Sequence, residues 1–159
     1  MTGNPAPFEL RRNGALLASF PVNVVGQHPG LFTLDSSGAG QLAALNQDGA
    51  VNRAANPASA GTAVVLFATG LGAMTPAPSD GSQPSQALNQ PVAKYQAAVN
   101  GHEAAIEYIG NAPTLVEGVV QINVRLPDPV PPLPGTPGIA FVSIFIDGGG
   151  GTYGSIAVR

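Results

Sequence analysis

Residues 92–110 read VAKYQAAVNGHEAAIEYIG, and this stretch decides the fold class. Two apolar runs flank Asn100-Gly101, a dipeptide that readily adopts the positive φ angles of a tight hairpin turn. Side chains at alternate positions of a strand share one face. That period groups Tyr95, Ala97 and Val99 in the first run, and Ala104, Ile106 and Tyr108 in the second. The stretch therefore predicts an antiparallel β-hairpin.

The flanking segments continue the strand pattern. Residues 119–127, VVQINVRLP, alternate apolar and polar side chains, as expected of an antiparallel strand with one solvated face. The run Ala63–Ala68 is apolar throughout and predicts a central strand that is covered on both faces. Residues 139–147 and 152–159 predict two further strands, and the proline-rich residues 128–138 cannot continue one.

Turn signals divide the rest of the chain. Gly, Pro, Asn and Asp supply the backbone angles that turns need. The predicted turns and loops are Asn13-Gly14 within a hairpin over residues 8–25, Asp48-Gly49 between strands Gln41–Asn46 and Ala50–Asn52, and a long loop over Met74–Pro91.

The composition disfavours helices. Charged residues make up 9% of the 159 residues, and the single lysine is Lys94, whereas solvated helices need Glu, Lys and Arg on their outer faces. The 21 glycines and 16 prolines interrupt every apolar run. About eight to ten short strands at turn intervals of about ten residues are typical of a sandwich. The sequence thus predicts an all-β, immunoglobulin-like antiparallel β-sandwich with an N-terminal β-hairpin.

Several classes of partner are excluded or disfavoured. The formal net charge of −3 gives no basic footprint for nucleic acid. The absence of cysteine excludes disulfides, thiolate zinc sites and cysteine nucleophiles. No run approaches about 18 apolar residues, so membrane insertion is not expected, and no cofactor is expected. The low charge resembles that of secreted bacterial β-modules, which predicts an extracellular or cell-surface location.

The chain divides into a hairpin, residues 1–28, and a sandwich module, residues 29–159. The hairpin cannot be stable as an isolated ribbon in water. Its large apolar side chains are Phe8, Leu10, Leu16, Leu17, Phe20 and Val22. We expect it to pack on the module of the same chain and give a monomer, because that buries these side chains across a short linker. A hairpin without such a partner would pair by its exposed edge with another copy and give a dimer.

The sandwich module resembles a known family. Residues 29–72, PGLFTLDSSGAGQLAALNQDGAVNRAANPASAGTAVVLFATGLG, and 99–127, VNGHEAAIEYIGNAPTLVEGVVQINVRLP, resemble the uncharacterised C-terminal domain family that is abundant in Acidobacteria of the Solibacter type. The last hundred residues resemble, more loosely, the immunoglobulin-like IPT/TIG modules. The resemblance implies a surface or secreted β-sandwich at the end of longer proteins, with neighbouring modules as partners, and it implies no reaction. Residues before Pro29 resemble the closing strands of a preceding module.

Candidate catalytic residues are few. A glycosidase needs two carboxylates about 5–10 Å apart. Glu103 and Glu107 lie four apart in one predicted strand, about 13 Å apart on one face, and would need a third carboxylate such as Glu117 or Asp128. The favoured interpretation is a solvated outer face of the hairpin. His28 and His102 lie in predicted turns, and no G-x-S-x-G motif supports a serine nucleophile.

Candidate metal ligands lie in two loops. Asn46, Asp48 and Asn52 could supply three oxygens to a hard cation such as calcium. Their spacing does not match the calcium loop, and Asp48-Gly49 is also explained by a turn. Asp147, before a run of glycines, has the same two interpretations.

Sugar binding would use exposed aromatic rings. The chain has no Trp, and its three tyrosines, Tyr95, Tyr108 and Tyr153, fall at inward or cross-strand positions, so packing in the core is expected.

The sequence therefore favours a non-catalytic structural or adhesion module of a secreted or cell-surface bacterial protein. Its partners would be neighbouring modules, a surface protein or a polysaccharide. Two alternatives stay open. An exposed tyrosine on a flat sheet face would favour a carbohydrate-binding module. A cleft in which Glu103, Glu107 and Glu117 converge would favour a glycoside hydrolase.

Overall fold

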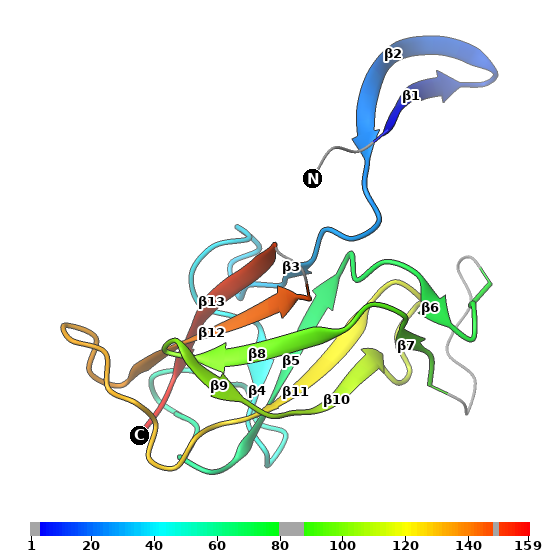
Figure 1. Cartoon of the computed structure of the whole chain (residues 1–159). Coiled ribbons are helices and arrows are strands. Elements are labelled where there is room, and N and C mark those ends of the chain that lie inside the picture. Colours follow the sequence, from blue (N-terminus) through cyan, green and yellow to red (C-terminus); the bar gives the residue numbers. More distant parts are fainter. Residues whose placement is uncertain (1–3, 80–87, 148–149) are drawn as a thin grey trace.

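The computed structural model describes residues 4–79, 88–147 and 150–159. This part of the chain is all-β, with thirteen strands and no helix (Figure 1). Accordingly, it contains no helix of the length and hydropathy that a membrane crossing requires. The predicted fold class is confirmed at this level.

One of the two main sheets has β5 at its centre. The strand order is β10-β11-β5-β3, and β4 also pairs with β5. The bounds are β3 (Gly30–Leu31), β4 (Ala44–Leu45), β5 (Ala63–Thr69), β10 (Ile106–Asn111) and β11 (Val120–Arg125). Val64, Leu66 and Ala68 are fully buried, but Val65 and Phe67 are only half-buried. The central position of this strand is confirmed, whereas its second face is only partly covered.

The second main sheet holds the hairpin that the opening stretch predicted. Its order is β13-β12-β8-β9. The bounds are β8 (Tyr95–Val99), β9 (His102–Ala104), β12 (Ile139–Ile146) and β13 (Gly151–Ala157). Asn100 and Gly101 adopt φ angles of 50° and 82°, so the predicted turn is confirmed.

The strand after this turn is shorter than predicted. The chain leaves the second sheet after Ala104 and continues from Ile106 as β10 in the first sheet, so residues 102–110 do not form one strand. A strand that bends from one layer to the other can face the shared core on both sides of the bend. Ala104 is buried and Ile106 packs against the same core. Glu103 and Glu107 therefore lie in different sheets.

Both sheets contribute to one apolar core. Buried side chains of β5 and β11 cluster with those of β8 and β12. Leu42 enters this core opposite Gly154, where a Cβ would lie 2.3 Å from Leu42 Cδ2. The two sheets thus form a β-sandwich-like pair of layers. Two short paired strands, β6 (Met74–Thr75) and β7 (Gln90–Pro91), lie within the predicted long loop, of which residues 80–87 fall outside the described residues.

The N-terminal hairpin consists of β1 (Asn4–Arg12) and β2 (Ala15–Val24). Asn13 and Gly14 form the predicted turn with φ angles of 50° and 82°. The expected packing on the sandwich is wrong for this structure: the hairpin extends away from the two main sheets (Figure 1). Its large side chains from Phe8 to Phe20 are 48–59% exposed.

The linker explains this position. The N–H of His28 donates to the carbonyl of Gly70 at 2.9 Å. A Cβ on Gly70 would lie only 2.2 Å from the carbonyl oxygen of His28, so the linker lies directly against the end of β5. The chain is held at this point, and the hairpin lies beyond it.

Candidate functional site

The sheet β13-β12-β8-β9 has one face that is turned away from the core. Core residues on β12 are Ala140, Val142, Ile144 and Ile146, so the intervening residues point outward. The strand register brings neighbours on β8, β9 and β13 to the same side. The side chains of this outer face are Gln96, Ala98, Glu103, Phe141, Ser143, Phe145, Tyr153 and Ser155.

Three aromatic side chains form a row on the outer face. Tyr153 is 70% exposed, Phe145 is 43% exposed and Phe141 is half-buried. Tyr153 lies opposite Ser143 on β12, midway between the two phenylalanines. At about 3.3 Å per residue the row is roughly 13 Å long, with successive side chains about 7 Å apart along the strands.

The expectation that Tyr153 packs in the core is wrong. On β13 the inward positions belong to Gly154 and Ile156, which are both buried, so alternation places Tyr153 outward. The sequence carried this signal, because Ile156 fixes the inward parity of the strand.

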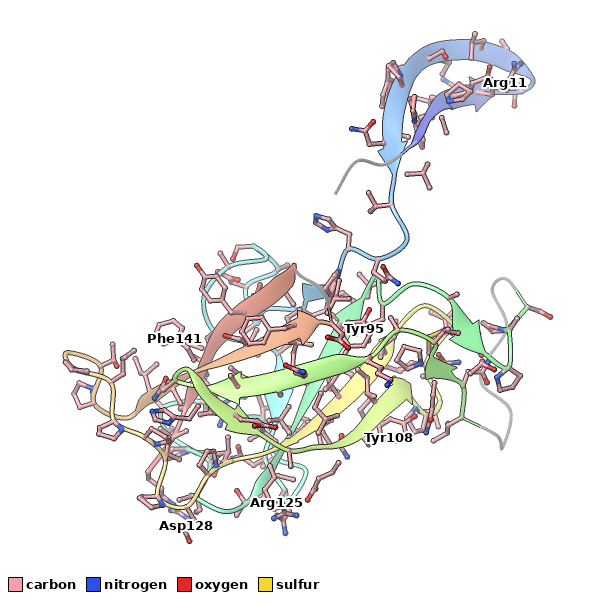
Figure 2. All side chains as sticks on the ribbon, viewed as in Figure 1. Arg11, Tyr95, Tyr108, Arg125, Asp128 and Phe141 are labelled. Atoms are coloured by element: carbon pink, nitrogen blue, oxygen red, sulfur yellow. The ribbon has the colours of Figure 1, made fainter. Side chains whose placement is uncertain are left out.

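Contacts at both ends hold the row of aromatic side chains in place. The N–H of Phe141 donates to Asn100 Oδ1 at 2.8 Å, and the N–H of Asn100 donates to the carbonyl of Phe141 at 2.9 Å. At the other end, Phe145 lies across Gly151, where a Cβ would lie 3.0 Å from Phe145 Cδ1. The rings therefore stand on strands rather than on loops. Figure 2 shows Phe141 beside β12 and β13, with Tyr95 near the other end of β12.

The other two tyrosines are fixed by hydrogen bonds. Tyr95 packs against the core, as expected, and its hydroxyl donates to the carbonyl of Leu71 at 2.8 Å. The hydroxyl of Tyr108 donates to the carbonyl of Asn111 at 2.7 Å. Burial raises the pKa of both phenols above the ordinary value. These rings are only partly exposed, which leaves Tyr153 as the tyrosine that is open to a ligand.

The three candidate carboxylates do not converge. Glu103 lies on the outer face, whereas Glu107 is on β10 and pairs with Arg125. Glu117 accepts a hydrogen bond from Asn111 Nδ2. Asn111 is four residues from Glu107 along β10, or about 13 Å, so Glu117 lies at the other end of that strand.

Glu117 borders a cleft of about 260 Å³ between the end of β5 and the loop before β11. Asn111 lines the same cleft, is 1% exposed, and its Oδ1 has no hydrogen-bond partner among the described residues. Among the described residues that line the cleft, Glu117 is the only carboxylate. Among the described residues, a two-carboxylate mechanism therefore finds no second carboxylate in this cleft.

The candidate metal ligands are hydrogen-bonded within the protein or lie apart from one another. Asn52 is fully buried, and its Nδ2 donates to Asn46 Oδ1 and to the carbonyl of Ala157, both at 2.8 Å. Asp48 Oδ1 accepts from the N–H of Ala50 at 3.0 Å, as in the predicted turn. Asp147 follows β12 at the end remote from Ala157. Within the described ranges, no three His, Cys, Asp or Glu side chains cluster as metal ligands would.

The two histidines lie apart. His28 is on the linker, in a hollow that Ile146 also lines. His102 pairs with Val99, at the end of β8 remote from Tyr95 and Ile146. Both side chains are exposed.

Comparison with protein-family models, curated proteins and solved structures finds no match to this chain. The resemblance to the Solibacter-type family and to IPT/TIG modules stays a prediction.

Proposed function

We propose that this chain is a non-catalytic adhesion module of a secreted or cell-surface bacterial protein, and that its outer face binds polysaccharide. The two-layer arrangement of antiparallel sheets supports an immunoglobulin-like sandwich as its scaffold. The observation that carries the proposal is the 70% exposure of Tyr153 between Phe141 and Phe145.

The shape of the row suits a linear ligand. The C–H faces of a pyranose ring are apolar and pack against the electron-rich face of an aromatic ring. Aromatic rings in a row of roughly 13 Å can contact successive sugars of one polysaccharide chain. They do not form a pocket that encloses one small molecule.

The polar neighbours suit a neutral ligand. Ser143 and Ser155 supply hydroxyls beside the rings, and Gln96 supplies an amide. Of the eight side chains that define the outer face, only Glu103 is charged. A face with hydroxyls and one charge can hydrogen-bond sugar hydroxyls without requiring an ionic ligand.

The test is a binding isotherm on insoluble cellulose, chitin and β-1,3-glucan. We expect retention on at least one, a loss of at least about tenfold in affinity for Tyr153→Ala, and little loss for Tyr153→Phe, which keeps the ring. Because the Tyr153 side chain is largely exposed, Tyr153→Ala should melt like the parent protein.

Phe32→Ala is the matched control. Phe32 is 39% exposed, and its N–H donates to Phe67 in the other sheet, so its loss should leave binding unchanged. Failure to bind any of the three polysaccharides, or equal binding by Tyr153→Ala, would contradict the proposal. Release of soluble sugar that Glu117→Gln abolishes would support the hydrolase alternative instead.

A further inference from the structure

The β1–β2 hairpin has one apolar face. The register pairs Phe8 with Phe20, and their ring centroids are 5.1 Å apart. Side chains that share this face by alternation and pairing are Ala6, Phe8, Leu10, Ala18, Phe20 and Val22 along its middle, with Val24 at one end and Arg12 and Ala15 at the turn end. The six side chains along the middle carry no charge, so covering them would bury none.

The opposite face is polar or proline-rich. It carries Pro5, Pro7, Glu9, Arg11, Ser19, Pro21 and Asn23, with Leu16 as its large apolar side chain beside the turn. Arg11 forms an ion pair with Glu9 at 2.9 Å and is exposed (Figure 2). The two faces of the hairpin therefore differ as the core and solvent faces of a sheet do.

Prolines oppose pairing at the edges of the hairpin. Pro7 lies opposite Pro21, and neither has an N–H, so this pair is not hydrogen-bonded within the ladder. In a pair that is not hydrogen-bonded within the ladder, the backbone N–H of each residue points to the outer edge of its strand. Proline has no such N–H. Each outer edge thus lacks the donor at this position, one of those that a further strand needs. Pairing of another strand across this point is disfavoured, so we expect a partner to meet the apolar face instead.

The size of the apolar face fits a weak symmetric dimer. Its large side chains are about half-exposed and offer on the order of 500 Å² per copy. Two such faces would bury about 1,000 Å² in total, at the lower end for specific interfaces.

We infer that the apolar face of this hairpin packs against the same face of a second copy of the chain. A two-fold axis places the same surface of both copies in contact, so one apolar surface serves both partners. The linker holds the hairpin clear of its own sandwich, which leaves room for the second copy (Figure 1). The dimer is independent of any ligand on the outer face.

Sedimentation equilibrium over a wide range of protein concentration tests the dimer. The mass should rise from 15.9 kDa toward twice that value as concentration increases. The double variant Phe8→Ser, Phe20→Ser should remain at the monomer mass and keep the melting temperature of the sandwich. A parent protein that stays monomeric throughout, or a double variant that associates equally well, would overturn the inference.

Cysteine cross-linking tests the face directly, because the chain has no cysteine of its own. Ala18 lies on the apolar face and its neighbour Ser19 on the other. Under mild oxidation Ala18→Cys should form a disulfide-linked dimer much faster than Ser19→Cys. Equal rates for the two variants would mean that the hairpins do not meet by this face.

Discussion

Asn52 has a structural role that the sequence alone did not predict. Its side chain joins the loop after β4 to the last residues of β13: Nδ2 donates to the carbonyl of Ala157, and Oδ1 accepts from the N–H of Ala157, both at 2.8 Å. Ala157 is buried, so no solvent replaces these bonds. The asparagine therefore acts as a structural cross-link between distant parts of the chain.

Asn52→Ala should lower the free energy of unfolding by about 3 kcal/mol, because the buried N–H of Ala157 and the Oδ1 of Asn46 lose the partner that Asn52 supplies. Thermal denaturation should show a fall in Tm of roughly 10 °C. Asn23→Ala, at an exposed hairpin position, is the control and should leave Tm unchanged. If the two variants melt alike, the cross-link contributes nothing to stability.

The residues of the site could be predicted only in part. Residue type suggested Asn46, Asp48 and Asn52 as candidate oxygen ligands of a cation, whereas the Asn52 side chain is hydrogen-bonded to Ala157, 105 residues further along the chain. No local pattern reveals such a partner. Tyr153, by contrast, could have been placed outward from the parity of Ile156.

At the level of elements, Gly70 and Gly72 explain why residues 68–72, ATGLG, can lie against the linker at the end of the central strand. Both have positive φ angles, and added Cβ atoms would lie 2.2 Å from the carbonyl oxygen of His28 and 2.6 Å from that of Gly26. Two glycines thus admit the linker against the end of β5. They fix where the hairpin leaves the sandwich.

Gly70→Ala should destabilise the chain by about 3 kcal/mol, since the methyl group would push the linker backbone away and the φ angle suits only glycine. Gly30→Ala is the control: its Cβ would meet no atom within 4 Å. Chemical denaturation should separate the two variants clearly. A Gly70→Ala protein as stable as Gly30→Ala would mean that the linker is not held at this point.

Elements with a strong local turn signal were predicted well. Asn13-Gly14 and Asn100-Gly101 both form the expected hairpin turns. The bend after Ala104 was missed because residues 102–110 keep the alternation of one strand while the chain changes sheets. That change depends on the position of β11 and β5, which the local sequence does not encode.

For the whole molecule, the two proposals rest on separate parts: a row of rings on strands β12 and β13, and an apolar hairpin beyond the linker. Either can fail without the other. The prediction of the N-terminal arrangement from burial alone was wrong, because it assumed that the nearest apolar surface was available to the hairpin. In the structure the linker lies against the end of β5, and the hairpin extends beyond it away from that surface.

The most direct test of the central claim, polysaccharide binding by the outer face, is a titration of the ¹⁵N-labelled protein with cello-, chito- and laminari-oligosaccharides followed by NMR. We predict that the amide shifts concentrate on β12 and β13 around Phe141, Phe145 and Tyr153. Shifts centred on the cleft at Asn111 and Glu117, or no shifts with any of these sugars, would contradict the account.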